Sequence, residues 1–298
     1  MRKRKTKGSV GEFDTNWKQR KEAVYSHWVK GTPQNQVQLA FRMHWLLFQE
    51  LMGGQDYAQC LEVGCGRGSI SSYFADNGFD CTLLDSSKSV LDTAQGIFSE
   101  NGHSARFVQG DALKLPFADK SFDVVVSIGL LEHFEEVSAP LLEQYRVLRP
   151  GGIFLGYIVP ERPDNVQRYF TWINKILLLG SKIALGKKKR PVAKNEIYRS
   201  DYGAERYLPV IKKLEVSDLQ VSGVYPLPMI SHSPEFPFSL LPPFLEKVLT
   251  KIFMAALGLR KFFYKKNSWL CREEMGQAFL IVFKKSELWP PKVKLYQS

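Results

Sequence analysis

The stretch LEVGCGRGSI, residues 61–70, decides the fold. Its apolar start is typical of a buried strand, Glu62 lies near the end of that strand, and the glycines predict a tight turn into a helix. Such a turn lets backbone N–H groups approach a ligand, and the following helix N-terminus favours negative charge. Gly64, Gly66 and Gly68 alternate, which excludes both the dinucleotide fingerprint and the P-loop. The stretch predicts a nucleotide-like cofactor site, with a plain strand-to-helix turn as the alternative.

A second acid follows at the end of the next predicted strand. Residues 80–84 are apolar and end at Asp85, and Ser86-Ser87 then offers an N-cap to a helix that runs to about Phe98. An acid at this point of a βαβ unit is placed to accept hydrogen bonds from a ribose diol. The alternative for Asp85 is a simple helix-capping role.

The alternation of strands and helices continues along the chain. Further predicted segments, in the order strand, loop, strand, helix and strand, are residues 105–109, 110–120, 122–128, 138–148 and 153–159. This order predicts an open, doubly wound parallel sheet that binds ligands at the carboxyl ends of its strands. The residues at such ends are Glu62, Gly64, Asp85, Asp111 and Gly129. Their convergence on one edge favours a cofactor site over a chance turn.

Three motifs carry a family resemblance. LEVGCGRGS, GDALKLPFADKSFDVVVSIGLLEHF and LRPGG, with Asp85 between the first two, closely resemble those of the class I S-adenosylmethionine-dependent methyltransferases over residues 59–160. Within that class, the chain resembles the small-molecule branch that includes quinone, sterol and sugar methyltransferases. The resemblance implies S-adenosyl-L-methionine as cofactor. It also implies a Rossmann-like, mostly parallel seven-stranded sheet with an antiparallel last strand, closed by residues 213–224 and 276–284.

The resemblance further implies a set of cofactor contacts. Glu62 and the glycines would hold the methionine part, and Asp85 would bind the ribose hydroxyls. Asp111 would accept from the adenine amino group, Ala112 would donate to the ring through its backbone, and Ile128 and Gly129 would line the floor beneath the sulfonium. The complete predicted set is Glu62, Gly64, Cys65, Gly66, Gly68, Asp85, Ser86, Asp111, Ala112, Ile128 and Gly129.

The loop after the fourth strand holds the candidate catalytic residue. Methyl transfer from a sulfonium depends mainly on alignment of the acceptor, and a base is needed only when the acceptor must lose a proton. His133 is the candidate base because imidazole titrates near neutrality; alternatively it shapes the pocket through a backbone hydrogen bond. Glu132 is predicted to be a structural partner. For Arg67 there are two alternatives, a salt bridge to the cofactor carboxylate or a solvated side chain.

Composition limits the chemistry around this core. Of 298 residues 44% are hydrophobic, as in ordinary globular proteins, and the net charge is +11. Four cysteines without a C-x-x-C pattern predict reduced thiols in a cytoplasmic protein. The five histidines show no metal-ligand spacing, so we predict no metal. The basic N-terminal tail lacks the apolar region of a signal peptide.

We predict one continuous catalytic domain with additions. Its expected parts are a basic tail and helical cap over residues 1–52, a cofactor-binding core over 53–160, a first amphipathic insertion over 161–212, and closing strands with a second basic insertion over 213–298. The cap is expected to be helical from about residue 15.

Both insertions look amphipathic. The first has apolar residues at helical spacing ahead of a basic run over residues 187–190. In the second, Pro242-Pro243 begins a helix with an expected apolar face of Leu245, Val248, Leu249, Ile252, Phe253 and Leu257. Glu246, Lys247, Thr250 and Lys251 are expected on the opposite face. The insertions could form a lid, dock on an anionic membrane surface, or pack on the sheet.

The expected function is methyl transfer to an oxygen or carbon of a small, apolar or lipid-linked acceptor, in the cytoplasm or at the periphery of a membrane. Two alternatives stay open. An RNA methyltransferase would suit the positive charge, but Gly129-Leu130-Leu131-Glu132 stands where enzymes that methylate amino groups of nucleic acids usually carry an N/D-P-P-Y motif, so a nucleic-acid acceptor is disfavoured. A non-catalytic cofactor-binding scaffold is disfavoured because the glycines and Asp85 are intact. The oligomeric state is not predicted.

Overall fold

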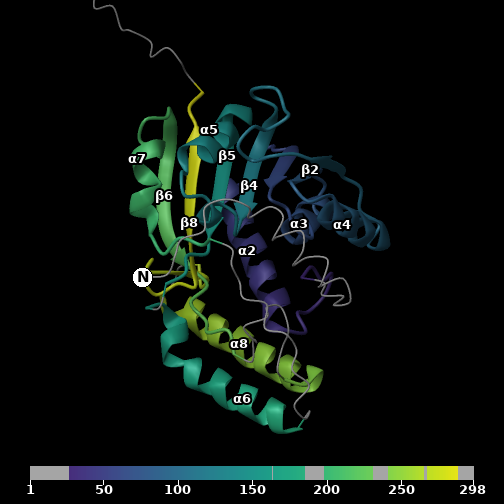
Figure 1. Cartoon of the computed structure of the whole chain (residues 1–298), viewed down its shortest axis with the longest axis vertical. Helices are drawn as coiled ribbons and strands as arrows, with labels where there is room; N and C mark the ends of the chain where they lie inside the picture. Colours follow the sequence, from purple (N-terminus) through teal and green to yellow (C-terminus); the bar gives the residue numbers. More distant parts are fainter. Residues whose placement is uncertain (1–26, 163, 185–197, 231–240, 265–266, 288–298) are drawn as a thin grey trace, which may run out of the picture.

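The computed structural model describes all residues except 1–26, 163, 185–197, 231–240, 265–266 and 288–298 (Figure 1). Its α-helices are α2 (Gln36–Met52), α3 (Ser69–Asp76), α4 (Lys88–Glu100), α5 (Ser138–Val147), α6 (Thr171–Ala184), α7 (Leu208–Ile211) and α8 (Pro243–Tyr264). Its strands are β1 (Gln59–Val63), β2 (Asp80–Asp85), β3 (Arg106–Gln109), β4 (Phe122–Ile128), β5 (Leu148–Ile158), β6 (Val216–Val224), β7 (Leu270–Cys271) and β8 (Ala278–Lys285). Short 3-10 helices are η1 (Leu131–His133), η2 (Val166–Tyr169) and η3 (Ala204–Arg206).

The strands form one mixed sheet in the order β3-β2-β1-β4-β5-β8-β6-β7. Strands β1 to β5 pair in parallel, and β8 is antiparallel to both β5 and β6. Strand β6 therefore points the same way as the parallel set. The predicted doubly wound, Rossmann-like fold with an antiparallel last strand is confirmed. The two-residue β7, which pairs with β6, adds an eighth strand that is too short to leave a sequence pattern.

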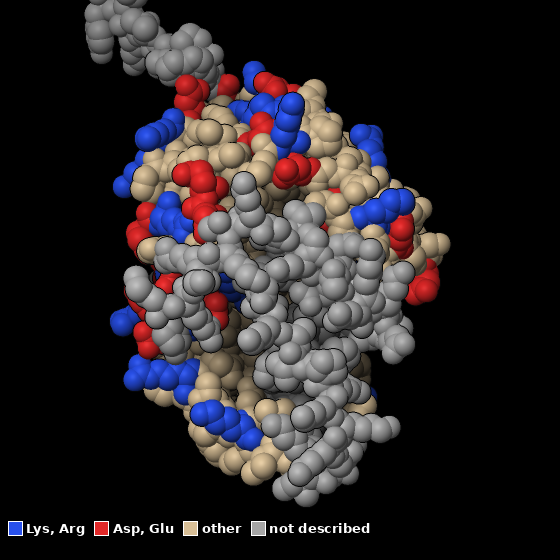
Figure 2. Space-filling view, viewed as in Figure 1, with Lys and Arg blue, Asp and Glu red and all other residues tan. Residues whose placement is uncertain are grey.

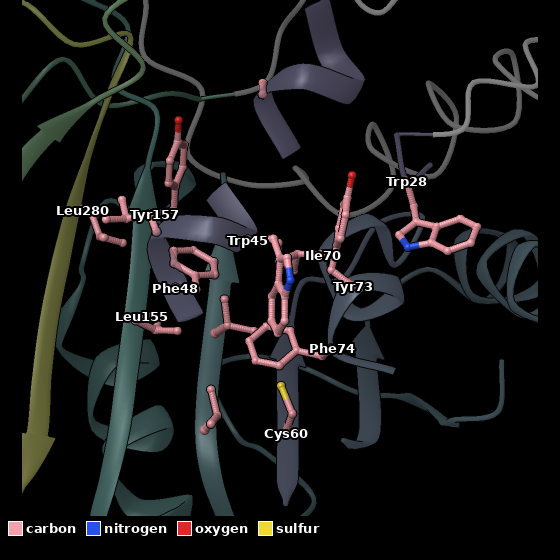
Figure 3. Packing of buried hydrophobic residues seen from close by; sticks show 14 of the residues in the cluster. Trp28, Trp45, Phe48, Cys60, Ile70, Tyr73, Phe74, Leu155, Tyr157 and Leu280 are labelled. Atoms are coloured by element: carbon pink, nitrogen blue, oxygen red, sulfur yellow. The ribbon is translucent and has the colours of Figure 1, made fainter. Parts of the chain in front are cut away.

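Alternate residues of the central strands face opposite layers. Val124 and Val126 of β4 belong to a core shared with α2, α3 and α4, whereas Val125 belongs to the core under α5 and α7. In the first layer, the rings of Trp45 and Phe74 meet edge to face, with centroids 4.9 Å apart (Figure 3). Burial on both faces explains the uninterrupted apolar run of β4.

The N-terminal helix is shorter than expected. Residues 27–35 are not helical, so the predicted start near residue 15 is wrong for this part, and residues 15–26 lie outside the described residues. Helix α2 begins at Gln36 because the side chain of Asn35 accepts a hydrogen bond from the Gln38 N–H over 2.9 Å. It ends at Met52, and the following Gly53 caps it with a left-handed φ of 64°.

Both predicted insertion helices exist as α6 and α8, but the face predicted for α8 is only partly right, because Phe253 and Leu257 are buried and other members are not. Val248 and Ile252 are more than half exposed, whereas Glu246 and Thr250 are buried with Phe253. Burial of Glu246 is compatible with the fold because its carboxylate accepts from Nε2 of Gln36 on α2 over 3.3 Å. The basic run at 187–190 lies outside the described residues.

The insertions leave the sheet from the same edge. Strand β5 leads into η2 and α6, and the parallel β6 leads toward α8, so both begin at carboxyl ends of strands. In Figure 1 both helices project beyond this end of the sheet, at the bottom of the view. Among the described residues, no helix combines the length and apolarity needed to cross a bilayer.

Candidate active site

The glycine turn after β1 is tightly folded. Gly64, Gly66 and Gly68 have φ values of 70°, 53° and 67°, in the left-handed region. A Cβ on Gly68 would lie 2.6 Å from the side chain of Leu83 and 2.8 Å from that of Phe98. The turn therefore needs glycine at this position for both its conformation and its packing.

Asp85 joins the glycine turn to the end of β2. Its Oδ2 accepts from the Gly66 N–H over 3.1 Å, and its Oδ1 accepts from the Ser87 N–H over 3.0 Å. Burial raises the pKa of Asp85, while these N–H groups lower it. Each carboxylate oxygen has further lone-pair capacity, which suits two ribose hydroxyls. The neighbouring Ser86 is half-buried, and its carbonyl accepts from Gln109 over 3.0 Å.

The side chain of Glu62 is more deeply buried than that of Asp85. It is 3% exposed, and its Oε2 accepts from both the N–H (3.2 Å) and the Oγ (2.5 Å) of Ser71 on α3. Burial raises the pKa of Glu62 to about 8, against the opposing hydrogen bonds from Ser71. The group is therefore mostly protonated at neutral pH.

Asp111 and Ala112 follow β3 at the same edge. The backbone N–H of Gly110 donates to the carbonyl of Asp85 over 3.0 Å, which fixes this loop against β2. Asp111 is exposed, with Oδ1 accepting from the Leu113 N–H over 2.9 Å, while Ala112 is buried. The adenine roles predicted for both stay predictions.

The end of β4 completes the edge. Ile128 and Gly129 are half-buried, Gly129 has a φ of 66°, and its N–H donates to the carbonyl of Tyr157 on β5 over 2.9 Å. A Cβ on Gly64 would lie 2.8 Å from the side chain of Leu130. The turn after β1 and the loop after β4 are therefore in direct contact.

The loop that carries Glu132 and His133 is held by a segment far along the chain. Nδ1 of His133 lies 2.7 Å from the carbonyl of Tyr198, and the Ser200 N–H donates to the carbonyl of Glu132 over 2.8 Å. Arg206 donates to the carbonyls of residues 134 and 135 and to the hydroxyl of Tyr198. The first insertion thus returns onto the loop that holds the candidate base.

Both titratable groups of this loop have shifted pKa values. Burial lowers the pKa of His133 to about 4 and raises that of Glu132 to about 7. The Tyr198 carbonyl can only accept, so Nδ1 of the neutral His133 ring donates and Nε2 carries the lone pair. No described residue gives the fully buried Glu132 carboxyl a hydrogen bond of normal geometry. The charge of Arg199 partly opposes the rise in the pKa of Glu132 that burial causes.

One open alternative is decided by the structure, and several residues near the site were missed by the expectations. Arg67 is 6% exposed, so the solvated alternative for it is wrong. His27, from the segment before α2, places Nδ1 2.9 Å from Oγ of Ser69 beside the glycine turn. Ser200 and Arg206 were also missed, because contacts over such sequence distances leave no local pattern.

The residues at this edge fit a nucleotide-like cofactor. The contact between Gly66 and Asp85 places a carboxylate beside the glycine turn, and a Cβ built on Gly129 would meet only Oε1 of Glu132, at 3.6 Å, within van der Waals range. Cys65 lies buried within the turn. No three His, Cys, Asp or Glu side chains gather as metal ligands in the part of the chain that the structure describes.

Comparison with known proteins agrees with this geometry. A family model described as a methyltransferase domain matches residues 61–156, the segment that carries the turn, Asp85, Asp111 and Gly129. Residues 61–156 thus form a methyltransferase domain of the class I, S-adenosylmethionine-dependent type. The family's cofactor is S-adenosyl-L-methionine.

Similar methyltransferases align over part of their length. The ubiquinone biosynthesis O-methyltransferase of Rickettsia conorii is 29% identical over 52% of this chain and 62% of its own. The fatty-acid O-methyltransferase of Mycolicibacterium smegmatis is 42% identical over 34% of this chain and 39% of its own. The chain therefore spans less than two thirds of the length of either relative.

A solved structure shares the fold. The YcgJ protein from Bacillus subtilis superposes with a TM-score of 0.52 at 19% identity, covering 83% of this chain and 100% of that one. At this identity the likeness shows the fold alone.

Proposed function

We propose that this protein transfers the methyl group of S-adenosylmethionine to an oxygen or carbon of a small, apolar or lipid-linked acceptor. The hydrogen bond between Gly66 and Asp85, on the same sheet edge as Gly129 and His133, is the observation that carries the proposal. The bound cofactor supplies an activated sulfonium methyl, so the protein has mainly to align the acceptor. The two similar O-methyltransferases are named for ubiquinone biosynthesis and for fatty acids, which supports a lipid-like acceptor.

His133 is the proposed base for an acceptor that must lose a proton. Its Nδ1–H is directed to the Tyr198 carbonyl, which leaves the Nε2 lone pair as the accepting atom. With a pKa of about 4 the ring is neutral across the physiological range, and it accepts a proton only when transfer makes the acceptor strongly acidic. Glu132, with Oε1 3.9 Å from Nε2 of His133, is placed to stabilise the protonated ring.

Aromatic rings pack in the buried core around Tyr157, whose carbonyl accepts from the Gly129 N–H. The rings of His44 and Tyr157 lie 4.3 Å apart, and those of Tyr225 and Trp269 lie 4.7 Å apart. Burial lowers the pKa of His44 to about 3, so this ring cluster carries no charge at neutral pH. We further propose a cytoplasmic, peripherally membrane-associated protein, which the free cysteines support.

Transfer of a labelled methyl group tests the function. The purified chain would be incubated with cofactor labelled at its methyl group and with aqueous, RNA and lipid fractions of a cell extract. Label is expected in the lipid fraction, and Asp85→Ala is expected to abolish it. Asp92→Ala, at an exposed carboxylate on α4, is the matched control and should retain transfer.

The other outcomes separate the alternatives. Label in RNA would overturn the proposed acceptor class. Cofactor binding that Asp85→Ala abolishes, with no label in any fraction, would contradict the enzyme and favour the scaffold.

A further inference from the structure

Helix α8 has two apolar stripes, and only one of them is covered. Phe253 and Leu257 are buried with Glu246 and Thr250, on the side that packs toward α2. A second set of large apolar side chains on the same helix is more than half exposed. These side chains are Phe244, Val248, Ile252, Leu259, Phe262 and Phe263.

The exposed set forms one line along the helix. Starting from Phe244, the positions 248, 252, 255, 259 and 262 follow in steps of three or four residues, and the small Ala255 is also exposed. Residues at such spacing share a face of an α-helix. The buried positions 246, 250, 253 and 257 form a similar line on the opposite side, which explains why periodicity did not identify the covered face.

Helix α6 repeats this arrangement. Trp172, Ile176 and Leu179 are 59%, 60% and 61% exposed and follow one another at steps of four and three residues. Scattered exposed apolar residues are normal, but stripes on two insertions that project from the same end of the sheet mark an interaction surface. We call these two stripes and the lysines beside them the α6/α8 surface.

The charges exposed on the α6/α8 surface have one sign. Helix α6 contains no acidic residue, and the single acidic residue of α8, Glu246, is 4% exposed. Lys175, Lys247, Lys251 and Lys261 are exposed, and Lys247 and Lys251 directly precede two residues of the stripe. Figure 2 shows this end of the molecule in tan and blue, without red among the described atoms, whereas red appears over the sheet.

We propose that the α6/α8 surface docks on an anionic lipid surface. Apolar side chains on one face of a helix insert at the boundary between headgroups and acyl chains, and flanking lysines are attracted to anionic headgroups. The exclusively positive exposed charge of both helices is complementary to such a surface. A second copy of this chain would bring like charges together, which disfavours self-association through this face.

Docking would direct the candidate active site toward the bilayer. Both insertions begin at carboxyl ends of strands, on the edge that holds Asp85 and Gly129. An acceptor dissolved in the membrane would therefore reach this edge without crossing water. The docking does not require methyl transfer, and it is tested without cofactor.

Vesicle sedimentation with the full chain tests the proposal. We expect the protein to pellet with phosphatidylcholine vesicles that contain about one third phosphatidylserine and to stay in the supernatant with pure phosphatidylcholine. Raising the salt from about 0.1 M to about 1 M should weaken the binding, because it screens the lysine charges.

Two double variants separate the apolar and the charged contributions. Phe262→Ser with Phe263→Ser is expected to weaken vesicle binding about tenfold or more, and so is Lys247→Glu with Lys251→Glu. Leu142→Ser, at a 46% exposed position on α5, controls for the loss of apolar surface. Lys212→Glu with Lys213→Glu, at exposed positions after α7, controls for the net charge. All variants should bind S-adenosylmethionine as the wild type does.

Three results would overturn the docking proposal. The first is no pelleting with anionic vesicles although the cofactor binds. The second is an equal loss of binding in the control variants. The third is a dimer, measured by sedimentation velocity, that the Phe262 and Phe263 substitutions dissociate, since a second copy would then cover the surface.

Discussion

The backbone N–H of Gly66 donates a hydrogen bond to Oδ2 of Asp85 over 3.1 Å. This contact joins the turn after β1 to the carboxyl end of β2, two elements that are adjacent only because their strands pair in parallel. It holds the carboxylate in one orientation before any ligand arrives. Such preorganisation lowers the cost of binding.

Asp85→Asn is expected to weaken binding of S-adenosylmethionine about tenfold to a hundredfold, because hydrogen bonds to a charged group contribute roughly 1.5–3 kcal/mol. Isothermal titration measures the change. Asp92→Asn, which removes an exposed carboxylate paired with Lys88, should bind normally. Equal affinities of the Asp85 variant and the wild type would exclude this carboxylate from the cofactor site.

Binding of S-adenosylmethionine at pH 7 is expected to release up to about one proton, because the cationic amino group of its methionine part favours the ionised form of Glu62. Titration in buffers of different ionisation enthalpy measures this release. Glu62→Gln should abolish it, and so should pH 9, where the wild-type carboxyl is already ionised. Unchanged release in the Gln variant would show that another group supplies the proton.

The contribution of Glu62 to the free energy of unfolding is expected to fall as the pH rises from about 4.5 to about 8. Between these values the folded protein keeps a proton on Glu62 that the unfolded chain has lost, so the folded state binds more protons and loses stability with rising pH. Urea unfolding at several pH values measures the slope. The fall between about pH 6.5 and 8 should be smaller in Glu62→Gln, where the raised pKa of Glu132 still contributes, and an equally steep fall in this variant would contradict the assignment.

Gly68→Ala is expected to destabilise the fold more than Gly78→Ala. Both glycines have positive φ values, so both substitutions carry the backbone strain of a left-handed residue, about 1–2 kcal/mol. Only at Gly68 would the new Cβ also clash with Leu83 and Phe98, which adds about 1–3 kcal/mol. Urea unfolding gives both values, and equal losses would contradict the packing at this turn.

The pH dependence of methyl transfer is expected to distinguish His133 from Glu132. If His133 accepts the proton, activity falls only as the pH drops through about 4, not through the usual 6.5. An inflection near pH 7 would instead report Glu132 and should vanish in Glu132→Gln. If the activity of the wild type instead changes near pH 6.5, and His133→Asn removes this change, the His133 ring is more exposed to water than in the structure.

Phe253→Ala and Phe244→Ala, both on α8, are expected to differ sharply in stability. Phe253 is 8% exposed, so its truncation should cost about 3–5 kcal/mol. Phe244 is 66% exposed, and its truncation should change the unfolding free energy by about 0.5 kcal/mol or less. Equal losses of stability would mean that both faces of α8 are covered by other parts of the protein.

The core was predictable because its signals are local. The β-branched run of β4, the glycine turn and the acid at the end of β2 each lie within one short segment, and their order specifies a parallel sheet. The five ends that converge on one edge follow from this topology. The positions of Glu62 and Asp85 beside α3 and the glycine turn agree with that expectation.

The insertions were less predictable for a physical reason. A helix with apolar residues on two faces has no pattern that says which face is covered, and burial of Glu246 depends on Gln36, far away in the sequence. The pKa of His133 likewise depends on burial by the return of the first insertion onto its loop. The helix start at Gln36 depends on a single capping residue, Asn35.

The hydrogen bonds between residues 198–206 and the Glu132–His133 loop also limit how the protein can be re-engineered. Two of these hydrogen bonds, from the Ser200 N–H to the Glu132 carbonyl and from the His133 ring to the Tyr198 carbonyl, join main-chain atoms of residues 198–206 to the loop. A graft that replaced the first insertion alone would leave the loop without its support. Transplanting acceptor preference between relatives therefore requires exchange of the insertion and the loop as one module.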